Sequence, residues 1–285
     1  MLGKLLKHEL KNTWKLCVVL LLTLGALTFF GSLALSAPFL KIENMENYLL
    51  TGQDLVSVVV LILCFMGIVV ITAGLHIYIG IRFYRTMFSN QGYLTHTLPV
   101  TPGKLLLSQT LSGCFWLFCF TLATIGSTIT LVGEGARQVL LKGADISIWQ
   151  AFYEFRRMFQ EIAGAEMQVA AGDIDQVFGA FAGLAIVGTF TALITIFTAT
   201  ALGHLSHKHK ILMSVIAYVV LTVAEQVVST IVMVPLILAG ILNESQNQMR
   251  VIAYSWIIAG VVFMIVNVVL YFISYGIISR KLNLE

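Results

Sequence analysis

One acidic residue lies deep inside an apolar stretch of this chain. Glu225 occupies the middle of segment 217–235, whose other residues are mostly apolar, and the amide of Gln226 follows it. Ionisable groups at membrane depth are costly and mark functional sites by default. The other apolar stretches have no central Lys or Arg that could pair with Glu225. Two interpretations stay open: a carboxyl group that lines a transport path or relays a proton, and a neutral one hydrogen-bonded between helices.

Three further features lie in apolar stretches. Asn267 is a third candidate for the wall of a path, after Glu225 and Gln226, although we favour interhelical hydrogen bonding for its amide. Gly179 and Gly183 form a GxxxG pattern, which predicts close packing against a neighbouring helix. A small polar stripe continues along the same stretch, at Thr191, Thr195 and Thr198.

Metal sites and catalytic motifs are not indicated. Three histidines lie within 204–210, but Lys208 and Lys210 would repel a cation, and no Cys or carboxylate is nearby. All 4 cysteines lie in apolar stretches, as expected for buried apolar side chains: Cys17, Cys64, Cys114 and Cys119. HExxH and GxSxG are absent, and Gly103-Lys104 lacks the Ser or Thr that a Walker A motif needs next. We expect no enzyme, and no cofactor or metal held by this chain.

The elements that carry these residues follow from composition. Only 11% of the 285 residues are charged, against about 25% in soluble domains. Backbone groups have no partners in lipid, so long apolar runs must be helices there. We expect an all-α, polytopic membrane protein with a single transmembrane domain over 1–285. Its six transmembrane helices are expected near 16–37, 55–80, 104–132, 177–203, 211–240 and 251–278.

Two amphipathic segments lie outside these spans. In 1–15 a ladder of four lysines opposes a leucine stripe, which predicts an interfacial helix at the cytoplasmic membrane surface, although a basic flank that only sets topology is the alternative. The connection 134–176 is expected to be an extracellular amphipathic loop, because its apolar residues between 148 and 162 recur at helical spacing. A lid over a path and a helix packed on the ends of the spans are equally open interpretations.

The distribution of basic residues predicts the orientation. With a cytoplasmic N-terminus, eleven Lys and Arg residues fall on the cytoplasmic side and six on the other. Lys and Arg concentrate in cytoplasmic connections. Both termini are therefore expected in the cytoplasm, as is the long connection 81–103.

That connection ends in a helix start, since Thr101 is a good N-cap and Pro102 suits the first helical position. Before it lies a mostly polar stretch with exposed apolar side chains, which indicates a docking surface. Folding back onto the ends of the spans is an equally open alternative. The residues concerned are Tyr93, Leu94, Thr95, His96, Thr97, Leu98 and Pro99.

These residues carry a resemblance to a known family. The stretch YLTHTLPVTPGKLLLSQ, 93–109, resembles ABC transporter permeases of the type-2 exporter superfamily, which show Leu-Pro-(Val/Ile)-(Ser/Thr) just before the third of six helices. Here the pattern reads Leu98-Pro99-Val100-Thr101. The six spans, the basic N-terminal segment and the chain length are similar as well. The short outer connection 241–250 departs from the large lipid-glycan and sterol exporters of that superfamily.

The resemblance implies partners, a location and a function. It implies a separate ATP-binding cassette subunit, which holds ATP and Mg and docks on a coupling helix near 88–98. It also implies a second permease copy, with a homodimer favoured over a heterodimer, contact with membrane lipid, no nucleic acid, and a place in the bacterial plasma membrane. The expected function is export of amphipathic or antimicrobial peptides. Export of lipids or drugs, and a proton-coupled secondary transporter using Glu225, are the alternatives.

Overall fold

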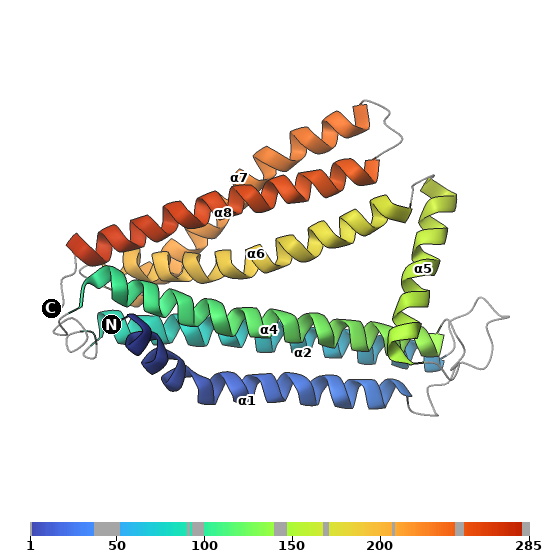
Figure 1. Cartoon of the computed structure of the whole chain (residues 1–285), viewed down its shortest axis with the longest axis horizontal. Helices are drawn as coiled ribbons and strands as arrows, with labels where there is room; N and C mark the ends of the chain where they lie inside the picture. Colours follow the sequence, from blue (N-terminus) through green and yellow to red (C-terminus); the bar gives the residue numbers. More distant parts are fainter. Residues whose placement is uncertain are drawn as a thin grey trace. The chain divides into compact units, whose positions relative to one another are not determined.

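The computed structural model contains only helices in the part of the chain that it describes (Figure 1). That part comprises residues 2–36, 52–89, 92, 100–139, 147–167, 171–206, 209–242 and 248–280. The helices are α1 (Leu2–Ser36), α2 (Gly52–Phe88), α4 (Pro102–Val139), α5 (Ile148–Met167), α6 (Ala171–Gly203), α7 (Lys210–Leu242) and α8 (Gln248–Arg280). All of them except α5 are long and apolar enough to cross a membrane, which confirms the six expected spans.

The N-terminal segment is the first part of a longer helix. Backbone helix geometry continues from Leu2 to Ser36 without a break, so a separate interfacial helix over 1–15 is not confirmed. No residue between the lysine ladder and the apolar run is a helix breaker, and each added residue supplies one more backbone hydrogen bond. At 1.5 Å per residue, this 35-residue helix is about 50 Å long, well beyond the hydrocarbon thickness of about 30 Å.

Local signals account for where two of the helices begin. The carbonyl of Thr101 accepts hydrogen bonds from the amides of Lys104 and Leu105, so α4 begins at Pro102 as the sequence predicts. At the start of α5, Ser147 and Gln150 form a capping box. The Ser147 amide donates to Gln150 Oε1 (3.0 Å), and the Gln150 amide donates to Ser147 Oγ (3.2 Å).

The helices extend into the predicted connections. α2 runs on to Phe88, α4 continues to Val139, and α6 already begins at Ala171. The first residues of 81–103, up to Phe88, and much of 134–176 are therefore helical, and α5 includes the amphipathic stretch 148–162.

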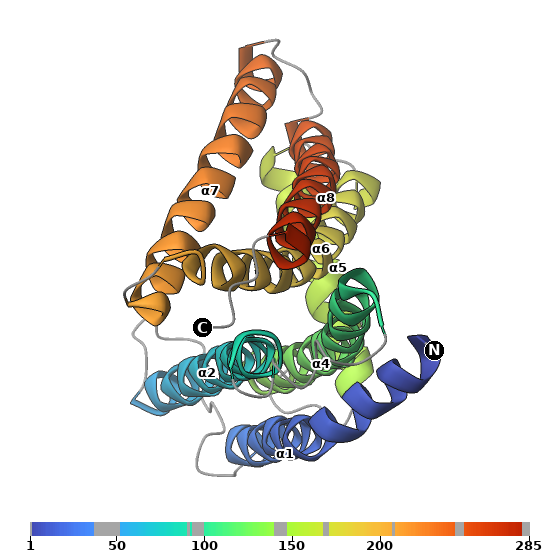
Figure 2. The ribbon, with the colours of Figure 1, turned by 90° about the vertical axis from the view of Figure 1, so that its left-hand side faces the viewer.

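The chain forms two compact units, and several helices contribute to both. The first unit comprises Met1–Trp14, His76–Phe118 and Val169–Glu285. Within it, α6 packs along α8 and also contacts α7 (Figures 1 and 2). The most exposed surface of this unit belongs to α7, where large apolar side chains such as Val223 and Ile231 are open to the surroundings.

The second unit comprises Lys15–Leu75 and Cys119–Gln168. Its elements are parts of α1, α2 and α4, with α5 lying across the end of α4 (Figure 1). Two glycines of α4 permit close approach within this unit. A Cβ at Gly133 would lie 2.8 Å from the carbonyl oxygen of Ile148, and one at Gly135 would lie 3.3 Å from Leu61 Cδ1.

The GxxxG pattern behaves differently. No described atom lies within 4 Å of where a Cβ would stand at Gly179 or Gly183, and both residues are exposed. The expected packing of this glycine pair against another helix is therefore not found in the described residues. Helix contact on α6 is concentrated further along, where its side chains are nearly all buried from Thr191 to Ala201.

Replacing Gly133 tests the junction of α4 and α5. Gly133→Ala should lower the free energy of unfolding by about 1–3 kcal/mol, because the new methyl group meets a backbone carbonyl that cannot rotate away. Gly126→Ala on the same helix is the control. Nothing lies within 4 Å of its Cβ position, so helix propensity predicts a gain of up to about 1 kcal/mol. Equal effects of the two substitutions on denaturant unfolding would contradict this packing.

Candidate functional site

Three threonines on one face of α6 organise the polar interior of the first unit. Thr191, Thr195 and Thr198 recur at i, i+4 and i+7, so they lie in a row along the helix. All three are buried. Each hydroxyl lies within hydrogen-bond distance of a backbone carbonyl of its own helix and of a side chain of α7 or α8. We call this set the threonine row.

The two ends of the threonine row bind α8. Asn267 Nδ2 donates to Thr191 Oγ1 at 3.0 Å, and Ser274 Oγ donates to Thr198 Oγ1 at 2.9 Å. The Thr198 hydroxyl also lies 3.2 Å from the Leu270 carbonyl. The expected role of Asn267 in interhelical hydrogen bonding is thus confirmed. Ser274, which sequence reasoning missed, is fully buried and takes part in the same contact.

The middle of the threonine row binds the acidic residue of α7. Thr195 Oγ1 donates to Glu225 Oε1 in a short hydrogen bond. Glu225 is half-buried, and among the described residues no basic side chain forms an ion pair with it. The hydrogen-bonded interpretation of this carboxyl group therefore has a specific partner. Its neighbour Gln226 is exposed and takes no part in the row.

Of the predicted path residues, the structure thus brings two to the same face of α6. Glu225 and Asn267 meet threonines one helical turn apart, whereas Gln226 points elsewhere. The predicted docking residues, from Tyr93 to Pro99, lie outside the described part of the chain. Two residues of the histidine-rich connection, at 207 and 208, also lie outside it.

Both helices that flank the predicted coupling segment are anchored within the first unit. Near the end of α2, Arg82 Nη2 lies 2.6 Å from Glu9 Oε2 of α1, and the Phe83 ring stacks on Phe197 of α6 with centroids 3.9 Å apart. At the start of α4, a Cβ at Gly103 would lie 2.9 Å from the Tyr275 ring of α8. We call these contacts the anchoring contacts.

A hydrogen bond also ties α1 to α4. Trp116 Nε1 donates to Thr13 Oγ1 at 2.8 Å, and both side chains are buried. Sequence reasoning missed this pair, and it used Glu9 and Arg82 only when charged residues were compared between the two sides of the membrane. A buried Trp usually finds a partner for its indole N–H, but the pattern of residues does not indicate which one.

His204 lies at the end of α6, beyond its apolar span. Its ring meets Phe88 edge-on, with centroids 4.7 Å apart. Neither ring nitrogen has a hydrogen-bond partner in the described residues. Burial, together with the positive charge of Lys210, lowers the pKa of His204 below its ordinary value of 6.5. The environment therefore favours the neutral imidazole.

The second unit has a buried acid of its own. Glu134 is 1% exposed, and its Oε1 accepts hydrogen bonds from Ser36 Oγ (2.7 Å) and Arg137 Nη2 (2.6 Å). It therefore joins α1 to α4. Glu134 lies between two glycines in the sequence. This position could have predicted its burial, because small neighbours allow other helices to cover a side chain.

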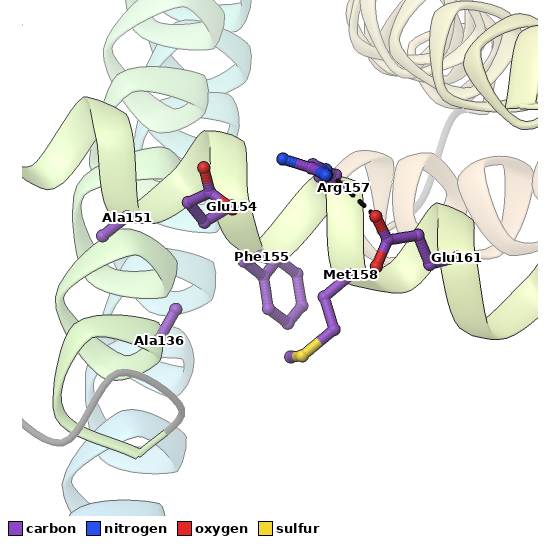
Figure 3. A pocket seen from close by; sticks show the side chains of 7 residues that line it. All are labelled: Ala136, Ala151, Glu154, Phe155, Arg157, Met158 and Glu161. Carbon is purple, nitrogen blue, oxygen red and sulfur yellow. Dashed lines mark hydrogen bonds and ion pairs between the residues drawn. The ribbon is translucent and has the colours of Figure 1, made fainter.

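Beside this junction, α5 borders a hollow of about 280 Å³ (Figure 3). Phe155 and Met158 contribute apolar surface, Glu154 is exposed, and Arg157 Nε lies 3.0 Å from Glu161 Oε1. Ligand pockets measure about 300–1,000 Å³ and are mostly enclosed, so this shallow hollow does not define a ligand. Among the described residues, no cluster of three or more His, Cys, Asp or Glu could hold a metal ion.

By the length and apolar character of six helices, the chain is a multi-pass membrane protein. Comparison of the chain with protein-family models, with curated proteins and with solved structures found no match.

The environment of His204 predicts how stability varies with pH. A lowered pKa means that the unfolded chain binds the proton more readily than the folded one. The contribution is thus fully present above the ordinary histidine pKa of about 6.5 and is lost as pH falls below it. His204→Gln should flatten the decline in melting temperature between about pH 7.5 and 5. His8→Gln, at an exposed position, serves as the control and should keep the wild-type slope. Identical slopes for wild type and His204→Gln would contradict this assignment.

Proposed function

We propose that this chain is the transmembrane permease subunit of an ATP-driven ABC exporter that moves amphipathic or antimicrobial peptides out of the cell. A separate ATP-binding cassette subunit, holding ATP and Mg, supplies the energy, so this chain is not itself an enzyme. Six spanning helices and the Leu98-Pro99-Val100-Thr101 pattern before the third of them support the proposal.

One observation supports the proposed coupling mechanism. The anchoring contacts tie both helices that flank 89–101 to other helices of the same unit. A force on that segment would reach α1 through Arg82 and Glu9, α6 through Phe83 and Phe197, and α8 through Gly103 and Tyr275. Packed side chains and ion pairs transmit displacement because interiors are dense and resist compression. A partner that grips the segment could therefore move three helices together.

The proposed location is the bacterial plasma membrane, with both termini in the cytoplasm. The lysines of the first turns of α1, at 4, 7, 11 and 15, are all exposed, while Glu9 on the same turns is paired with Arg82. The exposed charge there is mainly positive, which favours a surface of anionic lipid. The first turns of α1 would lie at that surface even though they are continuous with the span.

The permease is proposed to act as a pair, with a second copy of the same chain favoured over a different one. Its path would be mainly apolar, with few polar points. Glu225 and Asn267, held by the threonine row, and the exposed Gln226 are the proposed polar positions. An amphipathic peptide suits such a wall, because its apolar face can slide along it while its polar groups meet these points. Lipids or drugs are the alternative substrates.

Replacing two leucines of the coupling segment tests docking. Leu94→Asp with Leu98→Asp should abolish co-purification with the ATP-binding subunit and its stimulated ATPase activity. A charged side chain would enter an apolar contact and cost several kcal/mol through desolvation. Leu205→Asp, an exposed leucine beyond the end of α6, is the matched control and should retain both activities. Association that survives the double substitution would show that this loop is not the docking element.

A proton-coupled secondary transporter is the second candidate, favoured by a single observation. Glu225 is a carboxyl group within a span, with a threonine partner and no ion pair in the described residues. Such a group can gain and lose a proton as its surroundings become wet or dry.

This alternative makes a separate prediction in proteoliposomes. Transport driven by a proton gradient without nucleotide should disappear in Glu225→Gln and persist in Gln226→Leu. In the exporter, transport requires ATP and the partner subunit whether or not a proton gradient is present. Nucleotide-free transport by the wild type would therefore overturn the exporter proposal.

A further inference from the structure

A small hollow, whose mostly apolar wall also includes an ion pair and two uncharged polar side chains, lies among the anchoring contacts of the first unit. Its volume is about 20 Å³. Four helices line it, through residues that include Glu9, Arg82, Gln109, Ser112, Trp116 and Phe197. We call it the polar chamber. It is independent of the threonine row, which lies on another face of α6.

Two buried side chains in the wall of the polar chamber have polar atoms without partners. Gln109 is 7% exposed and Ser112 is 3% exposed. Neither Nε2 nor Oε1 of Gln109 has a hydrogen-bond partner in the described part of the chain, and the same holds for Oγ of Ser112.

Two other buried hydroxyl groups of α4 do have hydrogen-bond partners. Ser108 Oγ donates to the Leu105 carbonyl at 2.8 Å, and Thr110 Oγ1 donates to the Leu106 carbonyl at 2.9 Å. These are the usual backbone partners of buried hydroxyl groups in helices. Ser112 does not use them, so its hydroxyl remains available to something inside the chamber.

Leaving these atoms unpaired would be costly. A buried donor or acceptor without a partner costs about 1–3 kcal/mol. Folded proteins meet such groups with protein atoms or with ordered water. Three unpaired atoms, on two residues one turn apart on α4 that line a common hollow, therefore indicate a bound species.

The chemistry of the wall restricts that species. It must donate to Gln109 Oε1 and accept from Gln109 Nε2. A bare metal cation could meet Gln109 Oε1 but would leave the N–H groups of Nε2 without an acceptor. An anion without a proton cannot donate to Oε1. A volume of about 20 Å³ exceeds the roughly 10–15 Å³ needed for one water.

We propose that the polar chamber holds ordered water that completes the hydrogen bonding of Gln109 and Ser112. The ion pair of Glu9 and Arg82 also lines the chamber, and its side chains are 12% and 19% exposed, so water can enter beside it. The first turns of α1 are thus joined to α4 by one direct hydrogen bond, from Trp116 to Thr13, and by water beside it. Water at this position lets α1 shift slightly against α4 without leaving polar atoms unpaired. The proposal does not depend on what the protein transports.

X-ray hydroxyl-radical footprinting of the full-length protein in detergent tests it directly. Radiolysis of ordered internal water oxidises the side chains beside it, even where bulk solvent has no access. Trp116, in the chamber wall, is 8% exposed, and Phe120, one turn further on and outside the wall, is 1% exposed. Each rate is normalised to the same residue in the unfolded protein. Trp116 should then react several-fold faster than Phe120, and equal normalised rates would overturn the proposal without any variant.

Two variants sharpen the result. Gln109→Leu combined with Ser112→Ala removes the partners of the water, so oxidation of Trp116 should fall to the level of Phe120. Ser108→Ala, which removes a buried hydroxyl with a backbone partner, should leave the rate of Trp116 unchanged. A loss of labelling in both variants would show a general packing effect and would contradict the proposal.

A salt series separates water from a cation. The melting temperature of the wild type is compared with that of the double variant in NaCl, KCl and choline chloride at one ionic strength. Water predicts the same difference between the two proteins in all three salts. A rise in the wild type alone, in NaCl or KCl, would assign the chamber to a monovalent cation and overturn the proposal.

Discussion

Helices in a lipid bilayer gain no hydrophobic free energy when they exchange contacts with lipid for contacts with one another. Their arrangement depends on close packing and on the few polar groups that find partners between helices. In the first unit this condition is met on one face of α6, where three threonines contact Asn267, Glu225 and Ser274. Thr191 and Thr198 donate to carbonyls of their own helix, so their hydroxyl groups are already oriented to accept hydrogen bonds from α8. The positions of α7 and α8 against α6 follow from that face.

The same condition explains the contacts around the ends of α2 and α4. An ion pair and a stacked ring pair lie near the end of α2, and an indole hydrogen bond lies further inside α4, on helices that are otherwise apolar. Polar groups near the ends of spanning helices are cheaper than at their centres, because water and headgroups are close. This region can therefore combine strong contacts with ordered water, and a firm hold on α1 with some freedom of movement.

Within the second unit, glycines allow the helices to pack closely, whereas in the first unit polar side chains join them. Gly133 and Gly135 let Ile148 and Leu61 approach α4 closely, and Glu134 between them is covered well enough to hold Ser36 and Arg137. The capping box at Ser147 then sets where α5 begins. One short stretch of α4 thus positions α1, α2 and α5 within this unit.

Sequence alone determined the features that depend on neighbours along the chain. Six apolar runs became six long helices, Thr101-Pro102 started α4, and the repeat after 147 became α5. Tertiary structure decided which side chains meet, because that depends on the rotation of each helix about its axis and on which helices are adjacent. The amino-acid composition specifies neither the rotation of a helix nor its neighbours. Gly179 and Gly183 matched a packing pattern and stayed exposed, whereas Glu134, Ser274 and Gln109 matched none and are buried at polar junctions.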